Sequence, residues 1–389
     1  MKQISTSSAG RTNDNKQAKA GISKISRRDF LKATGAIMLV TGTGACGLFQ
    51  AEDSPAPTRT PSPPTSSNTP AALSPTPSPV SSESAEFQPD KAQVAFIKTS
   101  DRAAGIRRAM EFLEINQVNG KKVVLKPNFN SADSTPGSTH NDVLLTMVAS
   151  LWEMGAESIT VADRSGMGNT RQVMRQKGVT EMAEELGFNL TVLDELGPED
   201  WTAVHPPDSD WSRGFLFARP FLEADTIIQT CCLKTHRYGG HFTMSLKNSV
   251  GMVAKFGEDG YNYMQELHSS SNQRKMIAEI NSAYTPALVV VDAVEAFVSG
   301  GPATGKRVQS EVVLAGTDRI ALDAVGVAIL RYFGTTPEVE QGRIFEQEQI
   351  ARAVSLGLGV SRPEDIELLT DDAASADYAA QIQEVLLSA

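Results

Sequence analysis

From Lys91 to the end of the chain, short apolar runs alternate with segments of helical periodicity, and this alternation restricts the fold more than any other feature of the sequence. Residues 224–230 form a largely apolar run, and residues 286–291 form a continuously apolar one. Strands that are apolar on both faces are typical of a parallel sheet covered by helices on each side. The sequence therefore predicts an α/β domain over residues 91–389, with an open, largely parallel sheet and helices on both faces.

The expected elements follow from these two periodicities. We expect strands at residues 92–98, 121–125, 157–162, 189–193, 224–230, 286–291, 311–315 and 366–369. We expect helices at residues 101–118, 141–154, 170–186, 245–255, 272–282, 321–333 and 378–387. Whether residues 195–285 form a partly separate lobe stays open at this point.

Residues 1–45 have the pattern of a twin-arginine signal peptide. Residues 26–32 read SRRDFLK, which matches every position of the usual motif, and a weakly apolar run follows at residues 33–40. That run is too short to span a bilayer as a permanent helix. We therefore expect export by the twin-arginine machinery to a periplasmic or other extracytoplasmic location.

The end of this signal and the segment that follows it suggest a tether. Small residues precede Cys46, so cleavage before this cysteine and lipid attachment to its thiol, which would anchor the protein to a membrane, are both open. Residues 46–90 form a Pro/Ser/Thr-rich linker, and residues 52–86 alone hold nine of the 20 prolines. This composition cannot bury a core and predicts a disordered spacer.

Charge and cysteine content exclude some classes of protein. The chain has 36 basic and 46 acidic residues and a net charge of −10, and the predicted signal is its most basic part. This balance argues against a nucleic-acid partner. The three cysteines are Cys46, Cys231 and Cys232, which contain no CxxC pair. No iron–sulfur cluster is expected from them.

Polar side chains follow five of the expected strands. In a parallel sheet the carboxyl ends of the strands meet at one edge, where open α/β folds bind ligands. We therefore expect these five loops to converge on one crevice. The side chains are Lys126, Asn128, Asp163, Arg164, Ser165, Lys234, His236, Asp292, Glu295 and Asp318. Asp318 and Asp323 also flank a helix start, where capping is the expected role.

The stretch 231–251 has the highest density of chemically capable side chains. An anion or an anionic cofactor would be held by backbone N–H groups at the start of the predicted helix, which Thr243 or Ser245 would cap, and by side chains nearby. These candidate binding residues are Lys126, Asn128, Lys234, Thr235, Lys247 and Asn248. The candidate catalytic residues are His236, Asp292 and Asp163, and a metal would use His236, His241 and Asp292.

Five motifs in order resemble the domain of unknown function 362 family over residues 93–335. They are VVLKPN (123–128), LKTH (233–236), SLKNSVG (245–251), DAVEAFVSGGPATG (292–305) and AGTDRIALDAVG (315–326). The resemblance implies no established reaction. Some members carry ferredoxin-type iron–sulfur modules, which this chain lacks. The central stretch also resembles, at the level of the fold, the cofactor-binding half of lactate racemase-like proteins, which hold an anionic nickel-pincer cofactor. That analogy implies cofactor-contacting and proton-transferring roles for Lys234 and His236.

Two functions are consistent with these observations. The first is an exported enzyme whose crevice binds a small anionic substrate or cofactor, with or without a metal, and performs acid–base or redox-linked chemistry. The second is a non-catalytic, tethered binding protein or carrier for an anion or a metal. The sequence leaves open whether the protein is an enzyme.

Overall fold

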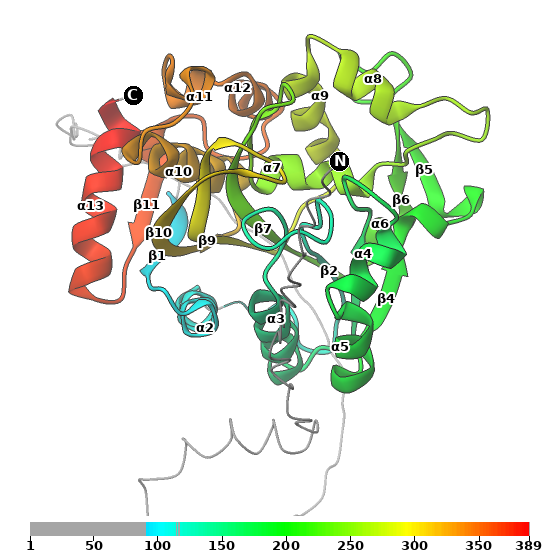
Figure 1. Cartoon of the computed structure of the whole chain (residues 1–389), viewed down its shortest axis with the longest axis horizontal. Helices are drawn as coiled ribbons and strands as arrows, with labels where there is room; N and C mark the ends of the chain where they lie inside the picture. The colour runs from blue at the N-terminus through cyan, green and yellow to red at the C-terminus, as the bar shows by residue number, and fades with distance from the viewer. Residues whose placement is uncertain (1–90, 114, 116, 389) are drawn as a thin grey trace, which may run out of the picture. The chain divides into compact units, whose positions relative to one another are not determined.

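The computed structural model describes residues 91–113, 115 and 117–388 (Figure 1). The predicted signal, Cys46 and the predicted linker lie outside the described residues. The described residues belong to one compact unit, which includes the whole of the segment 195–285. Within the described ranges, no helix combines the length and the apolar character needed to span a bilayer.

The centre of the fold is a mostly parallel sheet, as the sequence predicts. Along the sheet, the strand order in the described residues is β11-β1-β10-β9-β7-β2-β3-β4, and β8 pairs with β7 at its end. The strands are β1 (Ala92–Lys98), β2 (Lys122–Lys126), β3 (Ser158–Asp163), β4 (Asn189–Val192), β7 (Thr226–His236), β8 (His241–Thr243), β9 (Leu288–Gly300), β10 (Gly305–Gly316) and β11 (Ile366–Leu369). A separate two-stranded ribbon pairs β5 (Trp201–Val204) with β6 (Phe215–Ala218).

Four of the five strands that carry the predicted site, β2, β3, β7 and β9, run in the same direction. β2 is parallel to both β3 and β7, and β7 is parallel to β9. The exception is β10, which is antiparallel to both of its neighbours, β1 and β9. The end of β10 therefore lies at the opposite edge of the sheet, and Asp318, which follows it, does not join the other polar loops. Instead, its side chain caps the following helix by accepting from Ile320 N and Ala321 N.

Helices cover both faces of the sheet, which confirms the predicted architecture (Figure 1). The described helices are α2 (Arg102–Phe112), α3 (Asn141–Glu153), α4 (Thr170–Gln176), α5 (Val179–Leu186), α6 (Arg219–Leu222), α7 (Ser245–Asn248), α8 (Tyr263–Ser269), α9 (Gln273–Ile280), α10 (Arg319–Tyr332), α11 (Pro337–Glu340), α12 (Glu348–Ser355) and α13 (Ala373–Ser388). Short 3-10 turns connect several of them.

Alternation along the strands divides the buried side chains between the two faces. In β1, Val94 and Phe96 pack in the cluster that contains α10 and α13. Their neighbours Ala95 and Ile97 pack in the cluster that contains α2 and α3. Since successive side chains of a strand point to opposite faces, an unbroken apolar run is what a sheet covered on both sides requires.

Four elements differ in their bounds from the sequence prediction. β7 continues to His236 and β9 continues to Gly300, so both strands are longer than their apolar runs. The predicted helix 245–255 is only the short α7 followed by a 3-10 turn. The predicted helix 170–186 is broken at Gly178, whose φ of 72° is in the left-handed region that favours glycine.

The start of α7 is already occupied by a carboxylate from α10. Neither Thr243 nor Ser245 caps the helix, contrary to the prediction. Instead, the buried side chain of Asp323 accepts hydrogen bonds from Ser245 N (2.8 Å) and Leu246 N (3.2 Å). The backbone donors that were expected to hold an anion therefore bind Asp323. This contact fixes the start of α7 and with it the position of the next two residues, Lys247 and Asn248.

Asp323→Asn is expected to change how stability depends on pH. Burial raises the pKa of Asp323 to about 7, well above the value of about 3.9 in an unfolded chain. The folded state therefore binds an extra proton between these values, and the free energy of unfolding falls as pH rises through that window. Urea unfolding at several pH values should show a steeper fall for the wild type than for Asp323→Asn, by up to about 1.4 kcal/mol per pH unit. Parallel curves would contradict this assignment.

Candidate functional site

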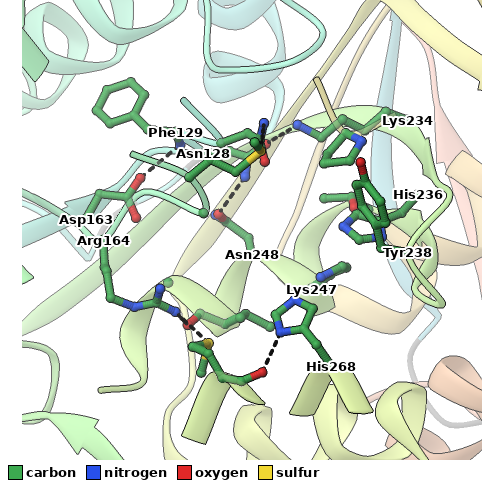
Figure 2. Close-up of a pocket in the computed structure, with 18 of the residues that line it drawn as sticks. Asn128, Phe129, Asp163, Arg164, Lys234, His236, Tyr238, Lys247, Asn248 and His268 are labelled. Atoms are coloured by element: carbon green, nitrogen blue, oxygen red, sulfur yellow. Dashed lines mark hydrogen bonds between the residues drawn. The ribbon is translucent and has the colours of Figure 1, made fainter. Parts of the chain in front are cut away.

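A pocket lies at the carboxyl ends of β2, β3 and β7, where the sequence predicts a crevice (Figure 2). Its volume is about 220 Å³. We call it the cationic cavity, because five basic side chains and one carboxylate line it. These six residues are Lys126, Arg164, Lys234, Lys247, Lys255 and Asp163. The other lining residues used below are Asn128, His236, Tyr238, Asn248, Met264 and His268.

The single carboxylate of the cationic cavity is already paired. Lys126 Nζ lies 2.6 Å from Asp163 Oδ1, and both residues are only 1% exposed. The other oxygen of Asp163 accepts from Phe129 N at 2.9 Å. Lys126 Nζ also donates to Pro127 O (2.7 Å) and Asn248 Oδ1 (3.2 Å). This pair therefore ties the end of β2 to the end of β3, and neither partner is available as an unpaired charge for a ligand.

Lys234 has polar partners but no carboxylate partner among the residues that the structure describes. Its Nζ donates to Asn128 Oδ1 at 2.8 Å and also to Gly137 O. Asn128 Nδ2 in turn lies 3.5 Å from Asn248 Oδ1, so the three side chains form a polar wall. Burial lowers the pKa of Lys234. Its ammonium supplies positive charge to the cavity while holding the loop after β2 in place.

Lys247 differs from the other buried lysines of the cationic cavity. It is 8% exposed, and among the described residues its ammonium makes no hydrogen bond and no ion pair. Burial, together with repulsion from Lys234 and Arg164, lowers its pKa to about 8. A buried cation without a partner is costly, so a ligand that carried negative charge to it would remove that cost.

Arg164 follows β3 and faces the cationic cavity from the side opposite Lys234 and Lys247 (Figure 2). Nε donates to Val253 O at 2.9 Å, and Nη2 donates to Val250 O at 2.7 Å. All of these acceptors are uncharged, and no described carboxylate forms an ion pair with the guanidinium. The carbonyl groups fix its orientation and leave its charge without a counter-ion.

Two histidines line the same cavity, and both are held neutral. His236 is 8% exposed, and burial, together with Lys247 and Lys234, lowers its pKa far below the usual value. Its Nδ1 is buried without a hydrogen-bond partner among the described residues. His268 Nδ1 lies 2.6 Å from Met264 O, and because a carbonyl can only accept, this nitrogen carries the proton. His268 Nε2 is then an acceptor, and burial lowers its pKa as well.

The predicted metal ligands are not brought together. Asp292 does not line the cationic cavity, because β9 continues past it to Gly300 and places it within the strand. Its carboxylate binds Arg102 Nε at 2.8 Å instead. His241 is paired with His236 across β7 and β8 but borders a neighbouring hollow rather than this cavity. In the described ranges, no three His, Cys, Asp or Glu side chains form a group that could hold a metal ion.

Thr235, predicted to contact the cofactor, has a structural role. Its hydroxyl donates to Phe297 O at 3.1 Å and lies 3.4 Å from Gly300 O, which ties β7 to β9. Its side chain points away from the cationic cavity because adjacent residues of a strand face opposite sides. Lys234 and His236, one position to either side of it, line the cavity.

The structure adds residues that the sequence did not single out as site candidates. The sequence indicates Arg164 only as part of a polar cluster and carries no signal for Tyr238, Lys255, Met264 and His268, which also line the cavity. Tyr238 packs its ring edge-to-face with His236 at a centroid distance of 5.9 Å. The segment from Lys255 to His268 has no strong periodicity before α8, so no sequence signal placed it next to the ends of the strands.

Together, the fold and the site define an α/β protein with a cationic cavity at the carboxyl edge of a largely parallel sheet. The family model described as Domain of unknown function (DUF362) matches residues 123–328, more than half of the chain, and the chain belongs to this family. The family prediction is thus confirmed. No curated protein matches the chain. A lactate racemase apoprotein from Thermoanaerobacterium thermosaccharolyticum is similar at 12% identity and a TM-score of 0.36, over 76% of this chain and 88% of that one. A similarity this low does not extend to function.

Proposed function

We propose that the cationic cavity binds a small anionic ligand or an anionic cofactor. The observation that supports this most strongly is the imbalance of charge: five basic side chains face one carboxylate, and that carboxylate is paired with Lys126. The protein as a whole is acidic, with a net charge of −10. Positive charge is therefore concentrated at this site against the overall balance, which is the arrangement that attracts and holds an anion.

Lys247 and Arg164 are the primary counter-charges in this proposal. Lys247 has no partner among the described residues, and Arg164 donates only to neutral acceptors. Lys234 and Asn128, which are hydrogen-bonded to each other, also line the cavity, and Asn248 contacts both Lys126 and Asn128. The volume of about 220 Å³ is small compared with sites for drug-sized ligands, which favours a compact anion.

An acid–base reaction at this site would depend on His236 and His268. Asp163 is committed to Lys126, and Asp292 lies outside the cationic cavity, so neither serves as the general base that the sequence suggested. His236 presents a neutral imidazole with Nδ1 unpartnered among the described residues, and His268 presents Nε2. A neutral imidazole can accept a proton from a bound substrate. His268 is the better base of the two, because burial and two lysines lower the pKa of His236 far below its usual value.

A second function, a non-catalytic carrier of an anion, is supported by the absence of an unpaired carboxylate among the residues that line the cationic cavity. A carrier needs counter-charges and a cavity that fits its ligand, but it needs no strong base. The two functions differ in what remains bound. An enzyme releases its product, whereas a carrier or a cofactor protein retains its ligand through purification.

Titration calorimetry of the full-length protein with phosphate, oxalate and pyruvate tests the shared element of both functions. We expect saturable binding of at least one anion with a stoichiometry of one, weakened by added salt because charge attraction is screened. Native mass spectrometry of protein purified from an exporting host then shows whether a ligand is retained. No saturable binding of any anion and no retained ligand would remove the proposal.

We also propose that the protein is exported by the twin-arginine machinery and, through Cys46, tethered to a membrane. The double variant Arg27→Lys/Arg28→Lys is expected to remain in the cytoplasm of an exporting host, because that pathway reads the arginine pair. Arg11→Lys, outside the motif, is the matched control. Cys46→Ser should move the exported protein from the membrane fraction to the soluble fraction if the thiol is lipidated. Normal export of the double variant, measured by cell fractionation, would contradict the first part.

A further inference from the structure

The amine of Lys247 has the position and surroundings that a nucleophile requires. It lines the cationic cavity, is largely buried, and has no hydrogen bond or ion pair among the described residues. The charged groups that act on it are Lys234 from β7 and Arg164 from the loop after β3, and both are cations. A cationic surrounding disfavours the ammonium form, which is how catalytic lysines become reactive amines at neutral pH.

Proton acceptors lie beside this amine. An added Cβ at Gly240 would be 2.8 Å from Lys247 Cε and 3.0 Å from His236 Nδ1, so the lysine and the imidazole converge on the same glycine. His268 is close enough to Lys247 for the charge on the lysine to lower the pKa of the histidine. Figure 2 shows Lys247 between the two histidine rings. The amine therefore has two neutral imidazoles as neighbours.

We propose that Lys247 forms an imine with the carbonyl carbon of a small 2-oxo acid, whose carboxylate lies against Arg164 and Lys234 in the cationic cavity. The inference rests on the proposed anion-binding function and names a ligand class for it. A 2-oxo acid supplies both features that the cavity selects for, an anionic group for Arg164 and Lys234 and an electrophilic carbon for the amine. The carboxylate also fixes the carbonyl in position for attack.

The reaction balances with the groups present. The neutral amine of Lys247 attacks the carbonyl carbon, a C–N bond forms, and one amine proton moves to the carbonyl oxygen to give a carbinolamine. The second amine proton then moves to the hydroxyl, the C–O bond breaks and water leaves, so that amine and carbonyl give imine and water. His268 accepts and returns these protons through Nε2. His236 is the weaker base, because its pKa is lowered far below the usual value. The step requires no oxidant or reductant.

Reductive trapping tests the proposal. The full-length protein is incubated with pyruvate and sodium cyanoborohydride, and the adduct is located by intact mass and peptide mapping. We expect one adduct per chain at Lys247, with a rate that rises with pH and is half-maximal near the pKa of about 8. An ordinary lysine would show its half-maximal rate near pH 10.4. Oxalate, an anion without an electrophilic ketone, should compete and slow the reaction.

Two variants separate the site from general lysine reactivity. Lys247→Arg retains the positive charge but cannot form an imine, so it should bind oxalate and lose the adduct. Lys177→Arg is the matched control, because burial also lowers the pKa of Lys177, which lies outside the cationic cavity and donates to Asp133 O. This variant should be labelled like the wild type.

The outcomes distinguish this inference from the function on which it rests. Saturable oxalate binding without an adduct at Lys247, or an adduct that persists in Lys247→Arg, would overturn the imine and leave the anion site intact. Labelling spread over exposed lysines, without competition by oxalate, would also overturn it. Failure of both oxalate binding and labelling would remove the anion site as well.

Discussion

Replacing Lys126 with methionine is expected to lower the free energy of unfolding by about 3–5 kcal/mol, the usual effect of removing one partner of a buried ion pair. The Asp163 carboxylate is 1% exposed in the wild type. In the variant it would lose its counter-charge and keep the hydrogen bond from Phe129 N. It also removes the contacts that Lys126 makes to Pro127 O and Asn248 Oδ1. Urea unfolding followed by circular dichroism measures the loss, provided that the slope of the transition stays unchanged.

An exposed ion pair between α4 and the turn after β4 provides the control. Arg171 pairs with Glu195, and their side chains are 47% and 45% exposed. Arg171→Met should cost at most about 1 kcal/mol. The double variant Lys126→Met/Asp163→Asn should be more stable than Lys126→Met alone. It removes the unpaired, buried negative charge of Asp163 and keeps a side-chain oxygen that accepts from Phe129 N. Equal costs for Lys126→Met and Arg171→Met would show that the buried pair does not hold β2 and β3 together.

Lys247→Met is expected to weaken anion binding by about 1.5–3 kcal/mol, the usual net value of a hydrogen bond to a charged group, which is roughly a 10- to 150-fold rise in Kd. Calorimetric titration with the anion that binds the wild type measures this change. The same variant should be at least as stable as the wild type, because it removes a buried charge that has no partner among the described residues.

This combination of weaker binding and unreduced stability is the signature of a residue that serves the ligand. Lys234→Met differs, because its ammonium holds Asn128 Oδ1 and Gly137 O, and its loss should reduce both binding and stability. Lys247→Arg should keep most of the affinity, since the charge remains. A destabilised Lys247→Met variant with unchanged affinity would assign Lys247 a structural role instead.

The sequence predicted the sheet and the convergence of polar loops on one edge because both follow from local periodicity. Unbroken apolar runs identify parallel strands, and parallel strands place the residues after them at one edge. Lys126, Asp163, Lys234 and His236 meet in the cationic cavity for this reason. This part of the site could be predicted without knowing which strands are neighbours in the sheet.

The remaining residues could not be placed because their positions depend on long-range pairing. Asp292 ends an apolar run, but β9 continues into a long hairpin with β10, so the carboxylate faces Arg102 of α2. The antiparallel direction of β10 moves Asp318 to the other edge. His268 comes from α8, about thirty residues beyond His236, and only the packing of that segment brings the two rings to one cavity.

The position of a bound anion tests the central claim most directly. Crystals of the protein soaked in selenate can be measured at the selenium edge, where the anion scatters anomalously and is distinguished from water. We predict an anomalous peak inside the cationic cavity, within hydrogen-bond distance of Lys247 Nζ or the Arg164 guanidinium, that is lost in Lys247→Met crystals. Selenate found only at exposed lysines, with the cavity holding water alone, would contradict the account.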